Sequence, residues 1–386
     1  MKITDIRTAV VEGNFDWVLV RVDTDADVSG LGEAYWGAGV AELVEKAKRF
    51  ALGEDPRDVN KIVDKMIRGL SGEGSLAGTT VTAVSGIEIA LWDLMGKVTR
   101  LPVYRLLGGN YRDKVRVYCD LHAGQKYEDT ASFVERARHA IDMGFTAIKF
   151  DIDLPNPFNP EGTTDPELSW FMPYNRTLTP REIKWIEGIV RAVRSAVGDD
   201  ADLLIDCHWK FNVSDALALA RALEPYGLYW LEDPVPPENI DALAKVSAGT
   251  TIPIATGENL YRAHGFLKLI SQQACSIVTP DIPKMGGLRE ARRVAELADL
   301  YYMGIAPHNV CSPIGTMAAA HAGASVPNFL VLEWHAIDVP WWADMVTSKV
   351  IEGGYIRVPE RPGIGLELNE DVVKAHLKPG STFFGE

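Results

Sequence analysis

One pattern occurs three times in the middle of the chain: LLIDCHW (203–209), LYWLEDP (228–234) and PIATGEN (253–259). Each copy ends a short apolar run on an acidic residue. These residues, Asp206, Glu232 and Glu258, follow one another at equal intervals (232 − 206 = 26 and 258 − 232 = 26). In a parallel barrel, one strand, its crossover helix and their loops consume about this much chain. The repeat therefore predicts three acids side by side at the carboxyl ends of neighbouring strands.

Three acids in that arrangement predict a metal site. If they are ionised and lie within ~4 Å of one another, each pair repels by roughly 4 kcal/mol at an effective dielectric constant near 20, and three pairs oppose folding by about 12 kcal/mol. A bound divalent cation removes this repulsion. Because the repeated positions offer carboxylates and no Cys or His, they suit Mg²⁺ better than Zn²⁺. We therefore expect Asp206, Glu232 and Glu258 to be Mg²⁺ ligands.

Outward from this repeat, strand-like runs alternate with amphipathic helices. The runs are VRVYC, AIKF, LLIDC, LYWLE, PIATGE, SIVTPD, GIAPH and FLVLE. Eight strands are the number in a closed (β/α) barrel. Helices are expected over 180–197, where Thr179 and Glu182 form a capping box, and from Ser214 to Gly227 and about Gly287 to Tyr302. The pattern indicates an α/β fold.

The two ends of the chain differ from the barrel region. Residues 1–112 open with two extended segments and continue into helices, which indicates a separate α+β domain. The barrel is expected over 113–348. Residues 349–386 contain a short strand and a Gly/Pro turn that fit no further barrel unit. We expect this segment to return to the N-terminal domain.

Composition narrows the class of protein. The chain has 386 residues, of which 47% are hydrophobic, and this is enough for two domains. Its net charge of −14 disfavours nucleic-acid binding. Its four cysteines form no CxxC pair, which favours buried reduced thiols and a cytoplasmic location. The first residues include acids and lack the continuous apolar run typical of a signal peptide, and no apolar stretch approaches the ~20 residues of a membrane span. We expect a soluble, uncleaved protein.

The connection after AIKF is unusually long. Between Asp151 and Thr179 it contains five prolines, together with Trp170, Phe171, Tyr174 and Arg176. Loops beyond about 15 residues are uncommon in compact domains and often act as lids or binding loops. We expect an ordered lid over 152–179 in which Tyr174 and Arg176 contact the substrate.

Further candidates lie at the ends of other strands. Asp281 and His308 end neighbouring strands, and a carboxylate beside an imidazole orients it and raises its proton affinity, which makes His308 a candidate general base. His208 lies two residues after Asp206. In an extended strand these two side chains point to the same side, so His208 is expected to face the substrate. A supporting role or a fourth metal ligand remains an alternative for His208.

Three charged residues have two interpretations each. Lys149 and Asp151 are two residues apart, so they are either an ion pair that holds the strand end or substrate-facing groups; Lys149 would then neutralise a substrate carboxylate or relay a proton. Glu333, after the eighth strand, is either a structural acid or a substrate contact.

The assembled residues resemble the enolase superfamily, specifically the acid-sugar dehydratases of its mandelate racemase group. AVSGIEIALWDLMGK (83–97) is similar to the family's N-terminal signature, and PGIGLEL (362–368) to its C-terminal motif. The resemblance covers nearly the whole chain. It implies a (β/α)7β barrel under an α+β capping domain that the C-terminal segment completes, with Asp206, Glu232 and Glu258 as Mg²⁺ ligands. It also implies symmetric homo-oligomers.

The resemblance assigns roles to other residues too. Asp281 and His308 match the family's Asp-His pair, Glu333 matches the acid after the eighth strand, and His208 matches the histidine that galactonate-type dehydratases use as general acid. One position departs from the pattern. Where racemases carry Lys-x-Lys, this chain has Lys149 followed by Asp151 in place of the second lysine. That change makes two-base racemisation doubtful.

The resemblance implies dehydration of a sugar acid, of R configuration at C2, to a 2-keto-3-deoxy acid. His308 would take the C2 proton and His208 would protonate the departing 3-hydroxyl. Segments near 12–17, 35–37 and 71–80, including Trp36, are expected to contact the sugar. The alternatives are an epimerase or racemase with Lys149 as second base, a mannonate-type dehydratase with a base from the Tyr174/Arg176 loop, and a non-catalytic sugar-acid binder.

Overall fold

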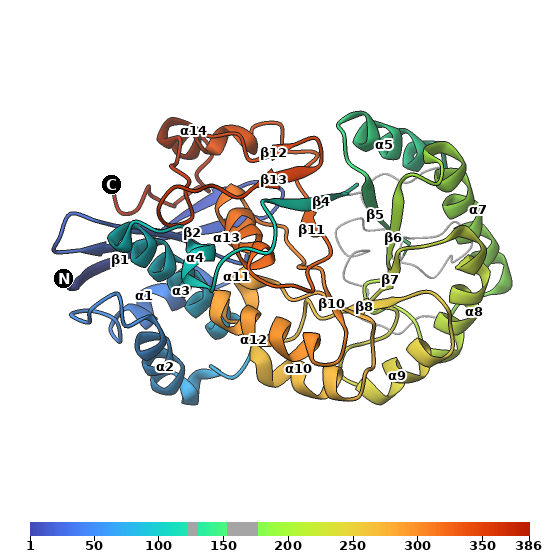
Figure 1. Ribbon diagram of the computed structural model, residues 1–386, viewed down its shortest axis with the longest axis horizontal. Coiled ribbons are helices and arrows are strands. Elements are labelled where there is room, and N and C mark those ends of the chain that lie inside the picture. Colours follow the sequence, from blue (N-terminus) through green and yellow to red (C-terminus); the bar gives the residue numbers. More distant parts are fainter. Residues whose placement is uncertain (122–129, 153–176) are drawn as a thin grey trace.

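The computed structural model describes residues 1–121, 130–152 and 177–386. Figure 1 shows an N-terminal unit of sheet and helices beside a ring of strands surrounded by helices. The predicted lid residues Trp170, Phe171, Tyr174 and Arg176 lie outside the described residues.

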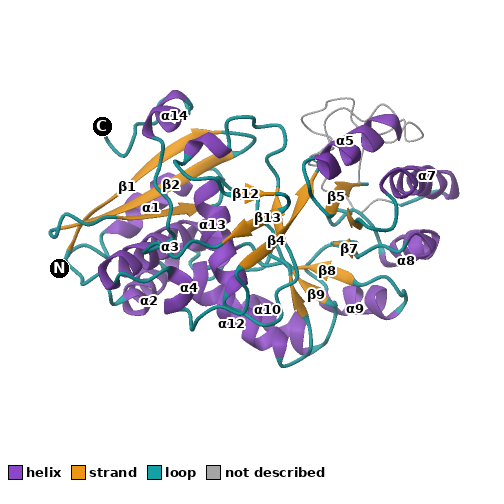
Figure 2. Cartoon of the chain, turned by 45° about the horizontal axis from the view of Figure 1, so that its top comes forward, coloured by secondary structure: helices purple, strands orange, loops and turns teal. Residues whose placement is uncertain are grey.

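The N-terminal unit is a three-stranded antiparallel sheet with helices on one face (Figure 2). Its elements are β1 (Ile3–Glu12), β2 (Asp16–Thr24), β3 (Gly30–Ala34), α1 (Val40–Lys48), α2 (Val59–Gly69), the 3-10 turn η1 (Ser71–Glu73), α3 (Thr79–Thr99) and α4 (Val103–Leu106). Helix α3 packs so closely on β3 that a Cβ atom at Gly32 would lie 2.4 Å from the carbonyl oxygen of Gly86. Glycine at position 32 thus permits this contact.

Eight strands form the barrel, and they follow one another around it in chain order. They are β4 (Lys114–Asp120), β5 (Ala147–Asp151), β6 (Asp202–Asp206), β7 (Trp230–Glu232), β8 (Ile254–Thr256), β9 (Ile277–Val278), β10 (Gly304–Ile305) and β11 (Leu332–Trp334). Parallel pairing links each strand from β4 to β10 to the next, and β11 pairs with β4. Between β10 and β11 the link is a bridge from Ile305 to Phe329, supported by the Glu333 N–H donating to Pro307. The predicted barrel with a capping domain is confirmed.

The barrel interior is filled by one buried residue from each strand or its immediate neighbour: Tyr118, Ala147, Leu204, Trp230, Ala255, Ile277, Ala306 and Val331. Three alanines leave room for the Trp230 ring, which stands edge-on to Tyr118. Such layers close the middle of the barrel, so the polar groups gather at one end.

Helices surround the strands (Figure 2). They are α5 (Thr130–Asp142), α7 (Pro180–Val197), α8 (Val213–Leu223), α9 (Ile240–Ala248), α10 (Arg262–Ser271), α11 (Ile282–Met285), α12 (Gly287–Asp299) and α13 (Pro313–Ala324), with the 3-10 turns η2 (Glu224–Tyr226) and η3 (Ala343–Met345). The predicted helix over 180–197 and its capping box are confirmed. The other two predicted helices end early, since α8 passes into η2 and α12 stops at Asp299.

The C-terminal segment consists of β12 (Ile351–Glu352), β13 (Tyr355–Arg357) and α14 (Glu370–Ala375). Strand β13 pairs antiparallel with the start of β4. Farther on, the Lys378 N–H donates to the Val10 carbonyl in β1, and the Arg7 guanidinium donates to the Phe384 carbonyl. Both chain termini consequently lie beside the N-terminal sheet (Figure 1).

Two expectations drawn from the sequence concern the cysteines and membrane-spanning helices. Cys119, Cys207, Cys275 and Cys311 are free and buried, as predicted. None of the helices in the described parts of the chain combines the length and apolar character needed to cross a bilayer.

Candidate metal and catalytic site

The predicted metal ligands meet at the carboxyl end of the barrel strands, called the rim below. Asp206 and Glu232 are the last residues of β6 and β7 and face each other in the parallel register, while Glu258 lies two residues beyond β8. One oxygen from each carboxylate lies within 4.8 Å of the others, and all three residues are buried. The equal spacing thus brings three oxygen ligands to one point of the rim.

The donor chemistry of this cluster suits a hard divalent cation. One oxygen of Glu232 accepts from the Trp230 indole N–H at 3.0 Å, whereas Oε1 has no hydrogen-bond partner among the described residues. Burial raises the pKa of Glu232 well above its usual range, and the Asp206 carboxylate adds to this shift. A buried carboxylate oxygen without a partner is costly, and coordination to Mg²⁺ or a similar ion would satisfy it.

Lys149 also lies within the cluster. Its ammonium nitrogen is 2.7 Å from Glu333 Oε1, 3.3 Å from Asp206 Oδ2 and 3.4 Å from Glu232 Oε2. Burial alone would lower the pKa of Lys149, but the carboxylates of Glu232 and Glu333 raise it well above its ordinary value. The predicted repulsion between the acids is therefore partly offset by an internal cation, because a positive charge at these distances attracts the Asp206 and Glu232 carboxylates.

Asp281 and His308 form a close pair. His308 Nδ1 lies 2.6 Å from Asp281 Oδ2, so Nε2 points the other way and lies 3.4 Å from Glu258 Oε2. Burial would lower the pKa of His308, but the charges of Glu258, Glu333 and Asp281 raise it to about 10. An imidazole held through Nδ1 presents Nε2 for proton transfer at the cluster.

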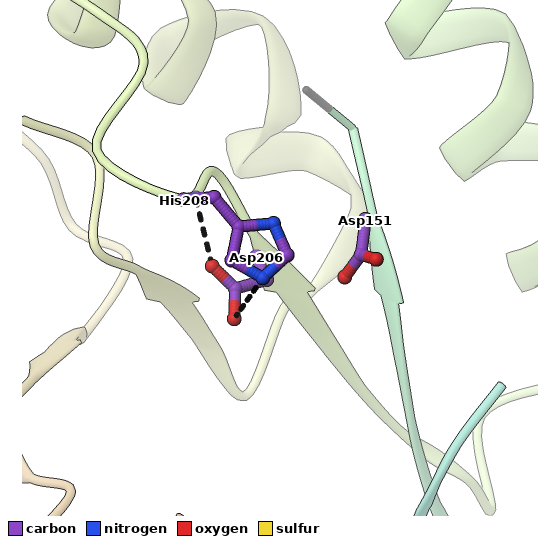
Figure 3. Close-up of side chains that lie close together, drawn as sticks. All are labelled: Asp151, Asp206 and His208. Carbon is purple, nitrogen blue, oxygen red and sulfur yellow. Dashed lines mark hydrogen bonds and ion pairs between the residues drawn. The ribbon is translucent and has the colours of Figure 1, made fainter. Parts of the chain in front are cut away.

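His208 reaches the cluster by a different route from the predicted one. Strand β6 ends at Asp206, and His208 and Trp209 adopt left-handed backbone angles (φ 42° and 61°), so the argument from an extended strand was wrong. The His208 N–H instead donates to Asp206 Oδ1 at 2.9 Å, and its Nε2 lies 3.7 Å from Asp206 Oδ2 (Figure 3). Non-glycine residues in this conformation are strained and cluster at functional sites.

Asp151 lies beside this turn. It ends β5 directly opposite Asp206, and Figure 3 shows it on the neighbouring strand with its carboxylate near Asp206 and His208. Asp151, Asp206 and His208 form a second group whose ligand atoms lie within 4.8 Å. This geometry keeps the alternative that His208 is a metal ligand.

Glu333 contacts one group on β5 and one in the loop after β10. Its Oε1 pairs with Lys149, and its Oε2 accepts the Asn309 N–H at 2.8 Å. Burial would raise the pKa of Glu333, but Lys149 and His308 lower it below its usual range. Glu333 therefore anchors the segment after His308, a structural role that agrees with one of its two predicted interpretations.

The N-terminal unit supplies aromatic residues above the rim. Trp36 stacks on Phe15 with ring centroids 5.1 Å apart, Phe15 lies 5.6 Å from His335, and Tyr35 lies 6.1 Å from His308. Sequence reasoning assigned the segments 12–17 and 35–37, which contain Phe15, Tyr35 and Trp36, to sugar contact but gave no task to His335. Apart from the positions of these residues in the chain, nothing in the sequence predicts the contacts, because they join elements that are far apart in the chain.

Comparisons with known proteins match both the N-terminal unit and the barrel. Residues 6–108 match the model of the mandelate racemase / muconate lactonizing enzyme N-terminal domain, and residues 132–372 match the enolase C-terminal domain-like family. A D-xylonate dehydratase from Haloferax volcanii is 47% identical over 100% of this chain and 91% of its own length. A D-gluconate dehydratase from Thermoproteus tenax is 32% identical over 96% of this chain and 71% of its own length.

A solved structure has the same architecture. A mandelate racemase/muconate lactonizing enzyme-like protein from Rubrobacter xylanophilus superposes with a TM-score of 0.92 at 44% identity, covering 100% of this chain and 99% of that one.

Proposed function

The chain belongs to the enolase superfamily, in its mandelate racemase group of acid-sugar dehydratases, and from this we propose that it is a Mg²⁺-dependent hydro-lyase that converts an aldonate into a 2-keto-3-deoxy acid. The observation that carries the proposal is the placement of two histidines on the same carboxylate cluster. His308 reaches it at Glu258, and His208 reaches it at Asp206.

The two histidines have environments suited to different tasks. The Asp281 carboxylate holds Nδ1 of His308 and directs Nε2 at the cluster. Because the Glu258 and Glu333 carboxylates raise the pKa of His308, a cation held by Glu258 would favour the neutral imidazole that takes the C2 proton as general base.

His208 is only partly buried, at 21% exposure, and lies beside Asp206, whereas His308 lies beside Glu258. In the proposed reaction His208 protonates the 3-hydroxyl as the C3–O bond breaks. The C2–H bond and the C3–O bond are both lost, water leaves, and the enol product tautomerises to the ketone.

Other residues bind and orient the substrate. Asp206, Glu232 and Glu258 would hold Mg²⁺, which when bound supplies positive charge that stabilises the negative charge developing on the substrate carboxylate. Lys149 adds a second positive charge next to Asp206. In the N-terminal unit, the buried side-chain oxygen of Asn14 has no partner among the described residues and is suited to a sugar hydroxyl.

D-Xylonate is the first substrate to test. The relative with 47% identity over the whole chain is a D-xylonate dehydratase, and this five-carbon acid has the R configuration at C2 that is expected for a base on the His308 side. Asp151 supports one-sided chemistry, because a carboxylate stands where a second lysine base would be needed for racemisation.

The test is a screen of D-xylonate, D-gluconate, D-galactonate and D-mannonate with Mg²⁺, in which 2-keto acid formation is followed. We expect turnover of at least one acid, loss of turnover in EDTA and recovery on adding Mg²⁺. Deuterium entering intact substrate in D₂O without loss of water would instead support the epimerase alternative and would contradict this proposal.

A further inference from the structure

We propose that Glu33, on β3 of the N-terminal unit, is a positioning residue for His308. The inference rests on the proposed role of His308 as the general base. The His308 loop, residues 308–312, connects β10 to helix α13, and Glu33 holds the far end of this loop across the interface between the two units.

The contacts of Glu33 are those of a helix cap supplied by another domain. Its fully buried carboxylate accepts the Ser312 N–H at 2.9 Å and the Gly315 N–H at 2.8 Å, and it also accepts the Ser312 hydroxyl. Ser312 is itself the N-cap residue of α13 and accepts the Ile314 N–H. A carboxylate at a helix N-terminus is favoured by the unpaired N–H groups and by the helix dipole.

The remainder of the His308 loop has no regular secondary structure and is held from outside. The Asn309 N–H donates to Glu333, the Val310 carbonyl accepts the Trp17 indole N–H, and the Cys311 carbonyl accepts the Trp342 indole N–H. Each residue from 309 to 312 thus has a backbone hydrogen bond to another element. Glu33 is distinguished by its three donors, and like Glu333 it offers a carboxylate, the kind of acceptor that forms the stronger bonds.

This arrangement links domain docking to catalytic geometry. His308 Nδ1 lies 2.6 Å from Asp281, and its Nε2 has to meet the substrate within hydrogen-bond distance. A shift of about 1 Å in a reacting group costs on the order of 100-fold in rate. In Glu33→Gln, an amide NH₂ faces backbone N–H or hydroxyl donors, so at least one contact is lost and the loop can move.

A purely structural role for Glu33 makes a different prediction, and Asp93 provides the matched control. Asp93 is also buried in the N-terminal unit and accepts two backbone N–H groups, from Leu31 on the same strand as Glu33 and from Ile364. Neither partner belongs to the His308 loop. Asp93→Asn should therefore lower stability in a similar way without displacing the base.

The experiment measures kcat and KM for the sugar acid that the unaltered enzyme converts, in Glu33→Gln, Ser312→Ala and Asp93→Asn, at a temperature where all are folded by circular dichroism. We expect kcat to fall about 10- to 100-fold in Glu33→Gln, with KM within about threefold, and to fall less in Ser312→Ala, which keeps two of the three donors to Glu33. Asp93→Asn should keep kcat within about twofold. Amide hydrogen exchange over residues 308–316 should accelerate in Glu33→Gln and stay unchanged in Asp93→Asn.

The outcomes separate this proposal from the proposed function. If the unaltered enzyme converts no sugar acid, the proposed function itself fails. If it does convert one and Glu33→Gln keeps full kcat, or Asp93→Asn loses as much, Glu33 has only a structural role and the positioning proposal is overturned. A lower kcat without faster exchange over residues 308–316 would overturn it as well. If Glu33→Gln does not fold, an unchanged kcat in Ser312→Ala would overturn the positioning proposal.

Discussion

The ammonium group of Lys149 reduces the electrostatic repulsion between the acids of the rim. The sequence pattern led to a metal as the means of removing their repulsion, yet Lys149 lies within 3.4 Å of both Asp206 and Glu232. The folded protein therefore carries part of the neutralising charge itself. A metal would add to this charge, and the two contributions can be separated by substitution.

Replacing Lys149 by methionine removes the charge and keeps most of the volume. Because the substitution leaves buried carboxylates facing one another, we expect Lys149→Met to lower the free energy of unfolding by roughly 3–5 kcal/mol in EDTA. Mg²⁺ should restore part of this loss, since a ligand that binds only the folded state stabilises it. Urea denaturation with and without Mg²⁺ measures both effects.

Lys97→Met is the control for that measurement. Lys97 pairs with the buried Asp93 at 2.6 Å but lies away from the rim. Its substitution should give a smaller loss that Mg²⁺ does not change. An equal response of both variants to Mg²⁺ would show that Lys149 does not share the charge of the metal site.

The two histidines predict different losses of function. In His308→Asn, both dehydration and exchange of the C2 hydrogen with D₂O should fall by about 10²- to 10⁴-fold, because the base is gone. In His208→Asn, dehydration should fall similarly while C2 exchange continues, because His308 still removes the proton. Proton NMR of the substrate in D₂O follows both reactions. Loss of exchange in His208→Asn, or activity that survives in His308→Asn, would contradict these roles.

At the scale of elements, the sequence predicts periodic and capped structure well and short strands poorly. The capping box of Thr179 and Glu182 correctly places the start of α7, because both residues act locally. By contrast, β9 and β10 have two residues each, so Asp281 and His308 lie in loops beyond the strands. The two residues still meet as expected for neighbouring strands, because β9 and β10 pair in parallel.

The turn at His208 shows the same limit within the candidate site. Its left-handed backbone angle cannot be read from the residue type, since histidine usually adopts extended or helical angles. The prediction that His208 faces the cluster came from the wrong geometry, and the structure supplies the right one. The convergence of Asp206, Glu232 and Glu258 was predictable because their spacing repeats with the strand-helix unit, whereas the contacts of Glu333 and Glu33 join distant segments.

The packing of α3 on β3 gives a prediction for glycine. A methyl group at Gly32 would meet the backbone of Gly86 and Ala90 at 2.4 and 2.6 Å, so Gly32→Ala should destabilise the protein by about 3 kcal/mol. Gly188 in α7 is the control. A Cβ there meets nothing within 4 Å, and Gly188→Ala should stabilise by up to about 1 kcal/mol through helix propensity. Thermal melts of both variants test this prediction. If Gly32→Ala left the stability unchanged, α3 and β3 could move apart at little cost.

In the whole molecule, α13 is the element through which the parts of the chain are joined. Glu33 caps its N-terminus, and the Arg112 guanidinium, in the connection between the two units, donates to the carbonyls of Gly323 and Val326 at its other end. These charges have the signs that the helix dipole favours at each end. In the last turn of the helix, His321 binds two further segments, so their contacts with α13 depend on its protonation state.

His321 is buried and neutral in the folded protein. Its Nδ1 accepts the Tyr104 N–H at 3.2 Å, and its Nε2 donates to the Ile364 carbonyl at 3.1 Å, so it ties α13 to α4 and to the C-terminal segment. Burial lowers the pKa of His321 from its ordinary value of 6.5 to about 4. The unfolded chain therefore takes up this proton first as the pH falls. The contribution of His321 to stability is complete above about pH 6.5 and declines as the pH falls towards 4.

Linkage gives the size of the effect and the means to isolate it. Between pH 7 and pH 5, His321 should account for about 2 kcal/mol of lost unfolding free energy. His321→Gln keeps a donor and an acceptor but does not titrate, so its stability should fall by about that much less over this range than the unaltered protein's, as measured by urea denaturation at both pH values. His264→Gln, at an exposed position on α10, controls for the loss of a histidine. Parallel pH dependence in His321→Gln and the unaltered protein would mean that the contacts of α13 with α4 and the C-terminal segment do not depend on the protonation of His321.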